Sequence, residues 1–121
     1  MILLDSSVWI DFFTEGTAAQ KAGGYLDDFA QVITPAIVLH EVYKKIKRDR
    51  SEEEALQAVS LMLKTTIIPL EESLALFAAD VALKYSLPMA DAIVYAAALE
   101  RKAEVLTKDA HFKGLEGVVM L

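Results

Sequence analysis

The chain has 121 residues, with 18 Asp and Glu against 12 Lys and Arg and a formal net charge of −6. Its length predicts a single domain over residues 1–121, and its 55% hydrophobic and 25% charged residues exclude intrinsic disorder. The absence of cysteine excludes a disulfide framework, a zinc–thiolate site and a cysteine nucleophile, and fits a reducing cytoplasm. The acidic balance by itself disfavours a nucleic-acid partner, because phosphate binding normally leaves a basic footprint.

Membrane and export functions are not expected. The longest stretch without Asp, Glu, Lys or Arg covers residues 29–40, which is shorter than the about 20 apolar residues that a membrane-spanning helix needs. The N-terminus meets Asp5 after a short apolar run and has no basic segment, unlike a signal peptide. We therefore expect a soluble protein of the cytoplasm.

The first part of the chain alternates short apolar runs with helical segments. Thr34 and Pro35 combine a capping residue with proline at the first helical position, which predicts the start of a helix. The expected segments are a strand at 2–4, helices at 6–13 and 18–29, a strand at 32–33 and a helix at 35–48.

The second part repeats this alternation. Ser51 followed by Glu54 is a capping-box pattern, and residues 92–99 carry no charge, which predicts a helix buried on all sides. The expected segments are a helix at 51–64, a strand at 65–70, helices at 71–85 and 89–101, and strands at 105–107 and 118–120. Short apolar strands followed by helices predict an α/β fold with a buried parallel sheet.

Four acidic side chains lie where such a sheet would bind a ligand. Asp5 ends the first predicted strand and Asp109 follows the fourth, and ligands of open parallel sheets bind at the carboxyl ends of the strands. Glu41 lies on the apolar stripe of its helix and Asp91 begins the charge-free helix, so both ionised groups need a partner. Like charges packed together require a divalent cation or raised pKa values, and oxygen ligands suit Mg²⁺ or Mn²⁺.

Structural interpretations of these acids stay open at this point. Asp5 can cap a helix, Asp91 can complement a helix dipole, and Asp109 can be an ordinary turn residue. Glu41 can pair with a lysine of its own helix. A further acid, Asp11, is expected to face solvent on the first helix.

The chain lacks the sequence motifs of several other functional classes. The chain contains no P-loop, no G-x-G-x-x-G turn and no G-x-S-x-G elbow. A receiver-like phosphotransfer domain with Asp5 as phospho-acceptor is the main structural rival. Such a domain usually has adjacent acids after its first strand, whereas Ser6 and Ser7 follow here. We expect structural roles for His40 and His111.

The chain resembles the PIN domain over essentially its whole length. The pattern consists of Leu4-Asp5-Ser6-Ser7-Val8-Trp9-Ile10, Glu41 inside a helix, Met89-Ala90-Asp91-Ala92, and Leu106-Thr107-Lys108-Asp109 followed by Phe112. The combination, in this order and spacing, is far more specific than any one of its pieces. The small single-domain form resembles VapC-type toxins of type II toxin–antitoxin pairs.

This resemblance implies a metal-dependent endoribonuclease built as a three-layer α/β/α sandwich around a short central parallel sheet. The catalytic quartet would be Asp5, Glu41, Asp91 and Asp109. Of these, Asp5, Asp91 and Asp109 would hold Mg²⁺ or Mn²⁺, with Ser6 and Thr107 as polar supports. The family also implies a homodimer and a small cognate antitoxin protein. A non-catalytic PIN-like interaction module is the alternative.

An RNA substrate needs cations near the acids. Lys44, Lys47 and Arg48 follow Glu41 on the same predicted helix and can contact phosphates irrespective of base sequence. The alternative is a solvated helix end that favours cations through its dipole. The quartet accounts for most of the net charge, because the other 14 acids are nearly balanced by the 12 Lys and Arg. The acidic balance therefore does not exclude RNA binding when a metal is present.

Overall fold

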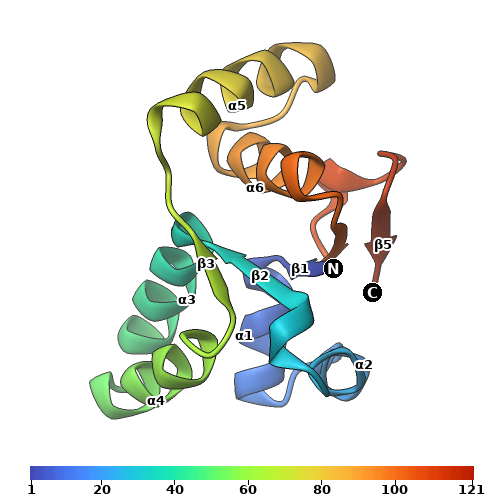
Figure 1. The fold of residues 1–121 in the computed structure, drawn as a ribbon. Helices are drawn as coiled ribbons and strands as arrows, with labels where there is room; N and C mark the ends of the chain where they lie inside the picture. The colour runs from blue at the N-terminus through green and yellow to red at the C-terminus, as the bar shows by residue number, and fades with distance from the viewer.

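Five parallel strands form the central layer of the protein. The structure, a computed structural model, describes all 121 residues. Its strands are β1 (Ile2–Leu4), β2 (Val32–Pro35), β3 (Thr66–Ile68), β4 (Glu104–Thr107) and β5 (Val118–Met120). Every neighbouring pair is parallel, in the order β3-β2-β1-β4-β5 (Figure 1). The prediction of a short parallel sheet, with the last strand at its edge, is confirmed.

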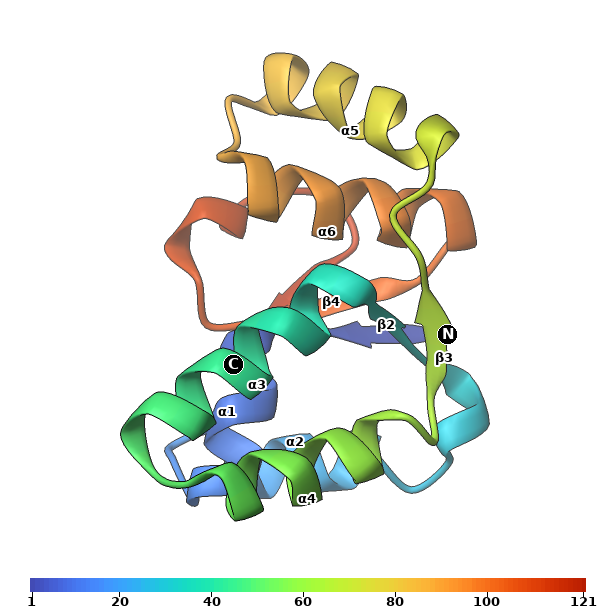
Figure 2. The same ribbon diagram turned by 90° about the vertical axis from the view of Figure 1, so that its left-hand side faces the viewer.

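Helices cover both faces of this sheet. They are α1 (Ser6–Thr14), α2 (Ala19–Tyr25), α3 (Ala36–Asp49), α4 (Glu52–Met62), α5 (Glu72–Tyr85) and α6 (Met89–Arg101), with 3-10 turns η1 (Phe29–Gln31) and η2 (Ala110–Phe112). Helix α6 packs on the sheet with α5 stacked outside it, whereas α1, α2 and α4 lie on the opposite face (Figures 1 and 2). Helix α3 runs beside α1 and α4. The three-layer α/β/α architecture is therefore confirmed.

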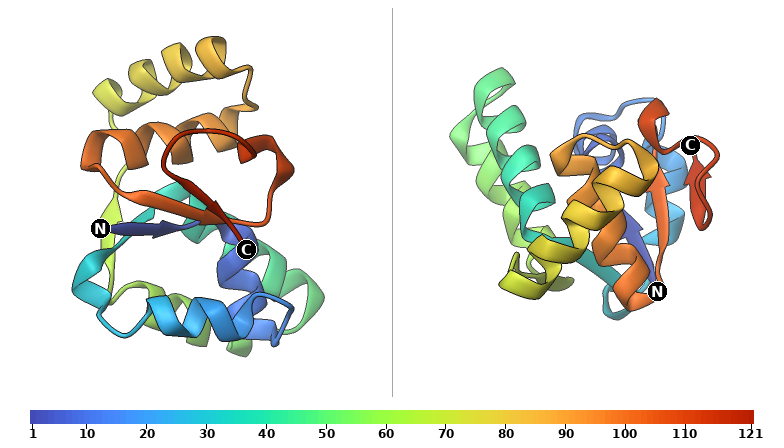
Figure 3. Two further views of the ribbon diagram at one scale, coloured as in Figure 1. Left: turned by 90° about the vertical axis from the view of Figure 1, so that its right-hand side faces the viewer. Right: turned by 90° about the horizontal axis from the view of Figure 1, so that it is seen from above.

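The strand order creates a topological switch point between β1 and β4. From β1 the chain moves outward through β2 to β3 and then returns to the other side of β1 with β4; β5 follows beyond β4 at the edge of the sheet (Figure 3). Loops leaving the two central strands diverge there and leave a crevice at the carboxyl ends. The 2-1-3-4-5 order of receiver-like sheets is absent, so the receiver-like alternative is wrong.

Apolar side chains of the sheet and of α6 form the main core. Leu3, Val105 and Phe112 are fully buried. Every residue of α6 from Ala92 to Ala98 is buried as well, because small alanine side chains allow close contact with the sheet on one side and α5 on the other. The prediction of an all-round buried helix is confirmed for residues 92–98, whereas Leu99, the last residue of the charge-free segment, is exposed. No helix of the protein is both long enough and apolar enough to span a bilayer.

Several boundaries differ from the prediction by a few residues, and two of the differences have a clear physical reason. The helix expected over 18–29 stops at Tyr25, and the Asp28 carboxylate accepts a hydrogen bond from the Ala30 backbone N–H (3.0 Å) that starts η1 instead. The predicted Thr34 cap is wrong, because Thr34 is a buried residue of β2 and α3 begins at Ala36. The Thr34 hydroxyl bonds the Thr65 hydroxyl (2.7 Å), and this tertiary partner outweighs local capping.

Candidate functional site

All four acids of the predicted quartet line one cleft of about 350 Å³ at the carboxyl edge of the sheet. Asp5 directly follows β1, and Asp109 lies two residues after β4. Glu41 comes from the second turn of α3 and Asp91 from the first turn of α6. The fold thus brings together carboxylates from four separate segments of the chain.

Hydroxyl groups hold Asp5 in place. This side chain is 4% exposed, and its Oδ2 accepts hydrogen bonds from Thr107 Oγ1 (2.9 Å) and Ser7 Oγ (3.5 Å). Its carboxylate makes no cap bond to α1, so the interpretation of Asp5 as a capping side chain is wrong. Thr107 Oγ1 also accepts from the Asp109 backbone N–H (2.9 Å), so one threonine connects two acids across β1 and β4.

The two predicted supports differ in their contacts. Thr107 supports Asp5, as described, whereas the Ser6 hydroxyl interacts with Glu41 and partly opposes the rise in the pKa of that residue, which burial dominates. Sequence reasoning missed Ser7, whose Oγ bonds Asp5 and accepts from the Lys108 backbone N–H (3.1 Å). Its position in the first turn after β1 was the available signal.

Burial and mutual repulsion raise the pKa of three of the acids. Burial is the largest cause for Asp5, and the Thr107 hydrogen bond opposes it only in part. Burial, followed by the charge of Asp5, raises the pKa of Glu41. Burial, followed by the charges of Asp109 and Asp5, raises the pKa of Asp91 to about 6. The cleft therefore concentrates negative charge that its own cations do not neutralise.

A divalent cation fits this donor set. Carboxylate oxygens from Asp5, Asp91 and Asp109 are hard ligands of the kind that Mg²⁺ and Mn²⁺ prefer. An added cation would also remove the repulsion that raises the pKa values of Asp5 and Asp91.

His111 belongs to the same cluster, although the sequence suggested a structural role for it. Its Nδ1 lies 2.9 Å from Asp91 Oδ2 and 3.1 Å from Asp109 Oδ1. Ligating atoms of these three residues all lie within 4.8 Å of one another. The only sequence signal was its position two residues after Asp109. The other histidine, His40, is exposed on α3.

Asp11 also lines the cleft, so the expectation that it faces solvent is wrong. Its side chain is 15% exposed, and its Oδ2 accepts from the Ala18 backbone N–H (3.0 Å), the Thr17 hydroxyl (3.3 Å) and Lys108 Nζ. Although burial raises the pKa of Asp11, these donors, led by Lys108, lower it overall. Asp11 is therefore an ionised, paired carboxylate that anchors Lys108.

Cations surround the cleft in a different pattern from the one expected. Lys45 and Lys108 line the cleft itself. Lys44 and Arg48 line an adjoining hollow that shares Glu41 and Ser6 with it. Lys47 turns away, toward the Tyr43 hydroxyl (3.3 Å) and Glu52 (3.4 Å).

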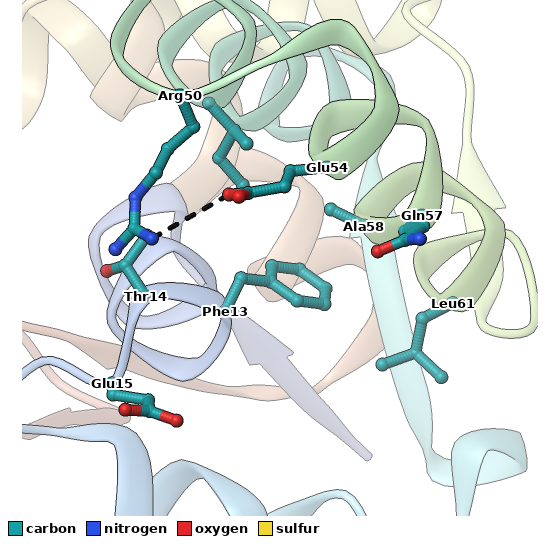
Figure 4. A pocket seen from close by; sticks show the side chains of 9 residues that line it. Phe13, Thr14, Glu15, Arg50, Glu54, Gln57, Ala58 and Leu61 are labelled. Carbon is teal, nitrogen blue, oxygen red and sulfur yellow. Dashed lines mark ion pairs between the residues drawn. The ribbon is translucent and has the colours of Figure 1, made fainter.

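A separate cavity of about 440 Å³ lies between α1, α3 and α4 (Figure 4). Phe13 and Leu61 form apolar parts of its wall, and Arg50 pairs with Glu54 at its rim (Nη1 to Oε2, 3.7 Å). It contains none of the four acids. The larger cavity is therefore distinct from the acidic cleft.

Comparisons with known proteins agree with this architecture. A toxin–antitoxin complex from Klebsiella pneumoniae is 27% identical, with a TM-score of 0.80 over 98% of this chain and 96% of the other. A sarcin–ricin loop cleaving VapC toxin of Mycobacterium tuberculosis is 17% identical, with a TM-score of 0.80 over 98% and 97%. FitAcB of Neisseria gonorrhoeae is 21% identical, with a TM-score of 0.74 over 100% and 96%.

No curated protein matches the sequence significantly. The PIN domain family, in contrast, matches residues 2–118, nearly the whole chain. Sequence pattern, strand order and structural neighbours agree, and the chain belongs to the PIN domain family.

Proposed function

We propose that the protein is a metal-dependent endoribonuclease of the cytoplasm and the toxin of a toxin–antitoxin pair. The observation that carries the proposal is the convergence of Asp5, Glu41, Asp91 and Asp109 in one cleft. Membership of the PIN domain family and the likeness to toxin structures support it. The substrate class we propose is RNA.

Asp5, Asp91 and Asp109 are the residues we assign to the metal, Mg²⁺ or Mn²⁺. When bound, such an ion neutralises charge on the phosphate oxygens and makes water a stronger acid. Asp5 is the best-fixed of the three ligands, because Thr107 holds one of its oxygens and its surroundings exclude water. Both hydrogen bonds from hydroxyl groups go to Oδ2, so Oδ1 is the oxygen that we assign to the ion.

Glu41 is the residue we assign to proton transfer. It is partly buried, and its pKa is raised toward neutral pH. A general base works best when its pKa lies near the pH of the reaction. A water molecule in the cleft can give a proton to this carboxylate as it attacks phosphorus. Removing the carboxylate should slow hydrolysis more than it weakens RNA binding.

Lysines at the rim supply contacts to the RNA backbone. Lys45 and Lys108 face the cleft, where they can bind the phosphates on either side of the cleaved bond. Lys44 and Arg48 extend this path along α3. Lys47 is the weakest candidate of the predicted set, because it lines neither the cleft nor the adjoining hollow.

A homodimer is the proposed assembly. Leu76 and Leu83 lie seven residues apart on one face of α5 and are 71% and 85% exposed, and Met89 at the start of α6 is 76% exposed. Large apolar side chains exposed in this way are costly in water and suit a protein interface. The second partner we propose is a small cognate antitoxin, by analogy with the toxin–antitoxin complex among the similar structures.

Cleavage of transfer, ribosomal and messenger RNA by the purified protein tests the activity. We expect cleavage with Mn²⁺ or Mg²⁺, none with EDTA, and a loss of at least about a hundredfold in Asp5→Asn. Asp80→Asn, an exposed acid on α5, is the matched control and should keep full activity. No cleavage of any RNA would overturn the proposal and favour an interaction module without catalysis.

A further inference from the structure

His111 places a nitrogen atom among the oxygen ligands of the cleft. We propose that His111 is itself a ligand of the divalent ion through Nδ1, which makes the site a mixed carboxylate–imidazole centre selective for Mn²⁺ over Mg²⁺. This inference rests on the proposed metal-dependent function. It adds a residue that the acidic quartet does not contain and names the ion the site selects.

The distances around Nδ1 suit one coordination shell. In an octahedral complex with metal–ligand distances of about 2.1 Å, adjacent ligand atoms are about 3.0 Å apart. Nδ1 lies 2.9 Å from Asp91 Oδ2 and 3.1 Å from Asp109 Oδ1. Nδ1 therefore already stands at the spacing of an adjacent ligand from each of the two carboxylate oxygens, and all three ligating atoms lie within 4.8 Å of one another.

The backbone fixes the position of the imidazole. The His111 N–H donates to Asp109 Oδ1 (2.9 Å) and starts η2. The next residue, Phe112, is fully buried and meets Tyr95 of α6 edge-on at 6.5 Å. Because Asp91 lies one turn before Tyr95 on α6, this packing ties the imidazole to both carboxylates and reduces the entropy lost on binding an ion.

The chemistry of the imidazole sets the metal preference. Mg²⁺ binds almost only oxygen ligands, whereas first-row transition ions accept imidazole nitrogen readily. The His111 side chain is 61% exposed, and water is a common hydrogen-bond partner for the second nitrogen of a ligating histidine. Replacing His111 should therefore weaken Mn²⁺ binding more than Mg²⁺ binding.

Electron spin echo spectroscopy of the Mn²⁺-loaded protein tests this assignment directly. Ligated nitrogen modulates the Mn²⁺ echo, and labelling histidine with ¹⁵N changes the modulation without any substitution. The chain contains only two histidines, so His111→Gln and His40→Gln form a matched pair. We expect the nitrogen signal in the wild type and in His40→Gln and its loss in His111→Gln.

Calorimetric titration supplies the second readout. In His111→Gln the Kd for Mn²⁺ should rise at least about tenfold, as expected for loss of a ligand or its close support, while the Kd for Mg²⁺ changes less than about twofold. Tight Mn²⁺ binding without a nitrogen signal, or a signal that survives in His111→Gln, would refute the His111 assignment and leave the proposed nuclease intact. Failure of the wild type to bind Mn²⁺ would likewise refute the His111 assignment, and failure to bind either Mn²⁺ or Mg²⁺ would overturn the metal-dependent function as well.

Discussion

Replacing Asp91 by asparagine should stabilise the metal-free protein while destroying its metal site. Burial, together with the charges of Asp109 and Asp5, raises the pKa of Asp91 from 3.8 to about 6, although His111 opposes this. The folded state therefore binds the Asp91 proton more tightly than the unfolded chain does. Binding of this proton stabilises the folded state fully below about pH 4, and this stabilisation is lost as the pH rises through about 6.

The pKa rise sets the size of the effect. A change from 3.8 to about 6 corresponds to about 3 kcal/mol, and this is an upper value because the side chain, 14% exposed, is partly screened by water at the cleft. Asparagine carries no charge at any pH. Asp91→Asn should therefore exceed the wild type in free energy of unfolding by up to about 3 kcal/mol at about pH 7.5 and by almost nothing near pH 4.

Urea unfolding in EDTA measures this difference. Trp9, the only tryptophan, is fully buried and reports unfolding by fluorescence. Saturating Mn²⁺ should reverse the order, because at a thousand times its Kd an ion adds about 4.1 kcal/mol to the wild type alone. Asp80→Asn serves as the control and should leave stability unchanged at every pH. An Asp91→Asn gain that is absent near neutral pH, or equal at all pH values, would refute the electrostatic account.

The remaining predictions concern local structure and assembly. Ser51→Ala removes the cap bond from the Glu54 backbone N–H (3.1 Å) and should cost about 1 kcal/mol in urea unfolding; an unchanged midpoint would contradict this. Gly16→Ala makes the new Cβ clash with the Asp11 carboxylate and should cost about 1–3 kcal/mol, whereas an unperturbed melting temperature would show that Asp11 can move freely. Leu76→Glu with Leu83→Glu should convert the proposed dimer to a monomer in light scattering, and an unchanged mass would place the interface elsewhere.

The sheet and its acids could be predicted from the sequence, because buried parallel strands appear as short apolar runs. Asp5 and Asp109 follow two such runs, and the two runs became the adjacent central strands β1 and β4. Glu41 and Asp91 stood out because ionised groups on apolar helix faces need partners. These signals are local in sequence, and the parallel topology alone brings them to one edge of the sheet.

Residues that depend on distant partners escaped sequence analysis. Asp11 looked solvent-facing on α1, yet Lys108 reaches it from 97 residues away in the sequence. Thr34 has a local sequence pattern typical of a helix cap, but its hydroxyl forms a hydrogen bond with the Thr65 hydroxyl instead. A lone histidine in a 3-10 turn has no periodicity to mark it, and the place of His111 depends on the burial of Phe112. Each of these contacts forms only after the chain has folded.

The chemical ends of the RNA products test the central proposal most directly. Hydrolysis by water attack on phosphorus, with the 3′ oxygen as leaving group, gives 5′-phosphate and 3′-hydroxyl ends. Cleavage by the RNA's own 2′-hydroxyl instead gives 5′-hydroxyl and 2′,3′-cyclic phosphate ends. We predict 5′-phosphate and 3′-hydroxyl ends, formed only with Mn²⁺ or Mg²⁺ and absent in Asp5→Asn. Cyclic phosphate ends, or cleavage that persists in EDTA, would contradict a metal-dependent nuclease at this cleft.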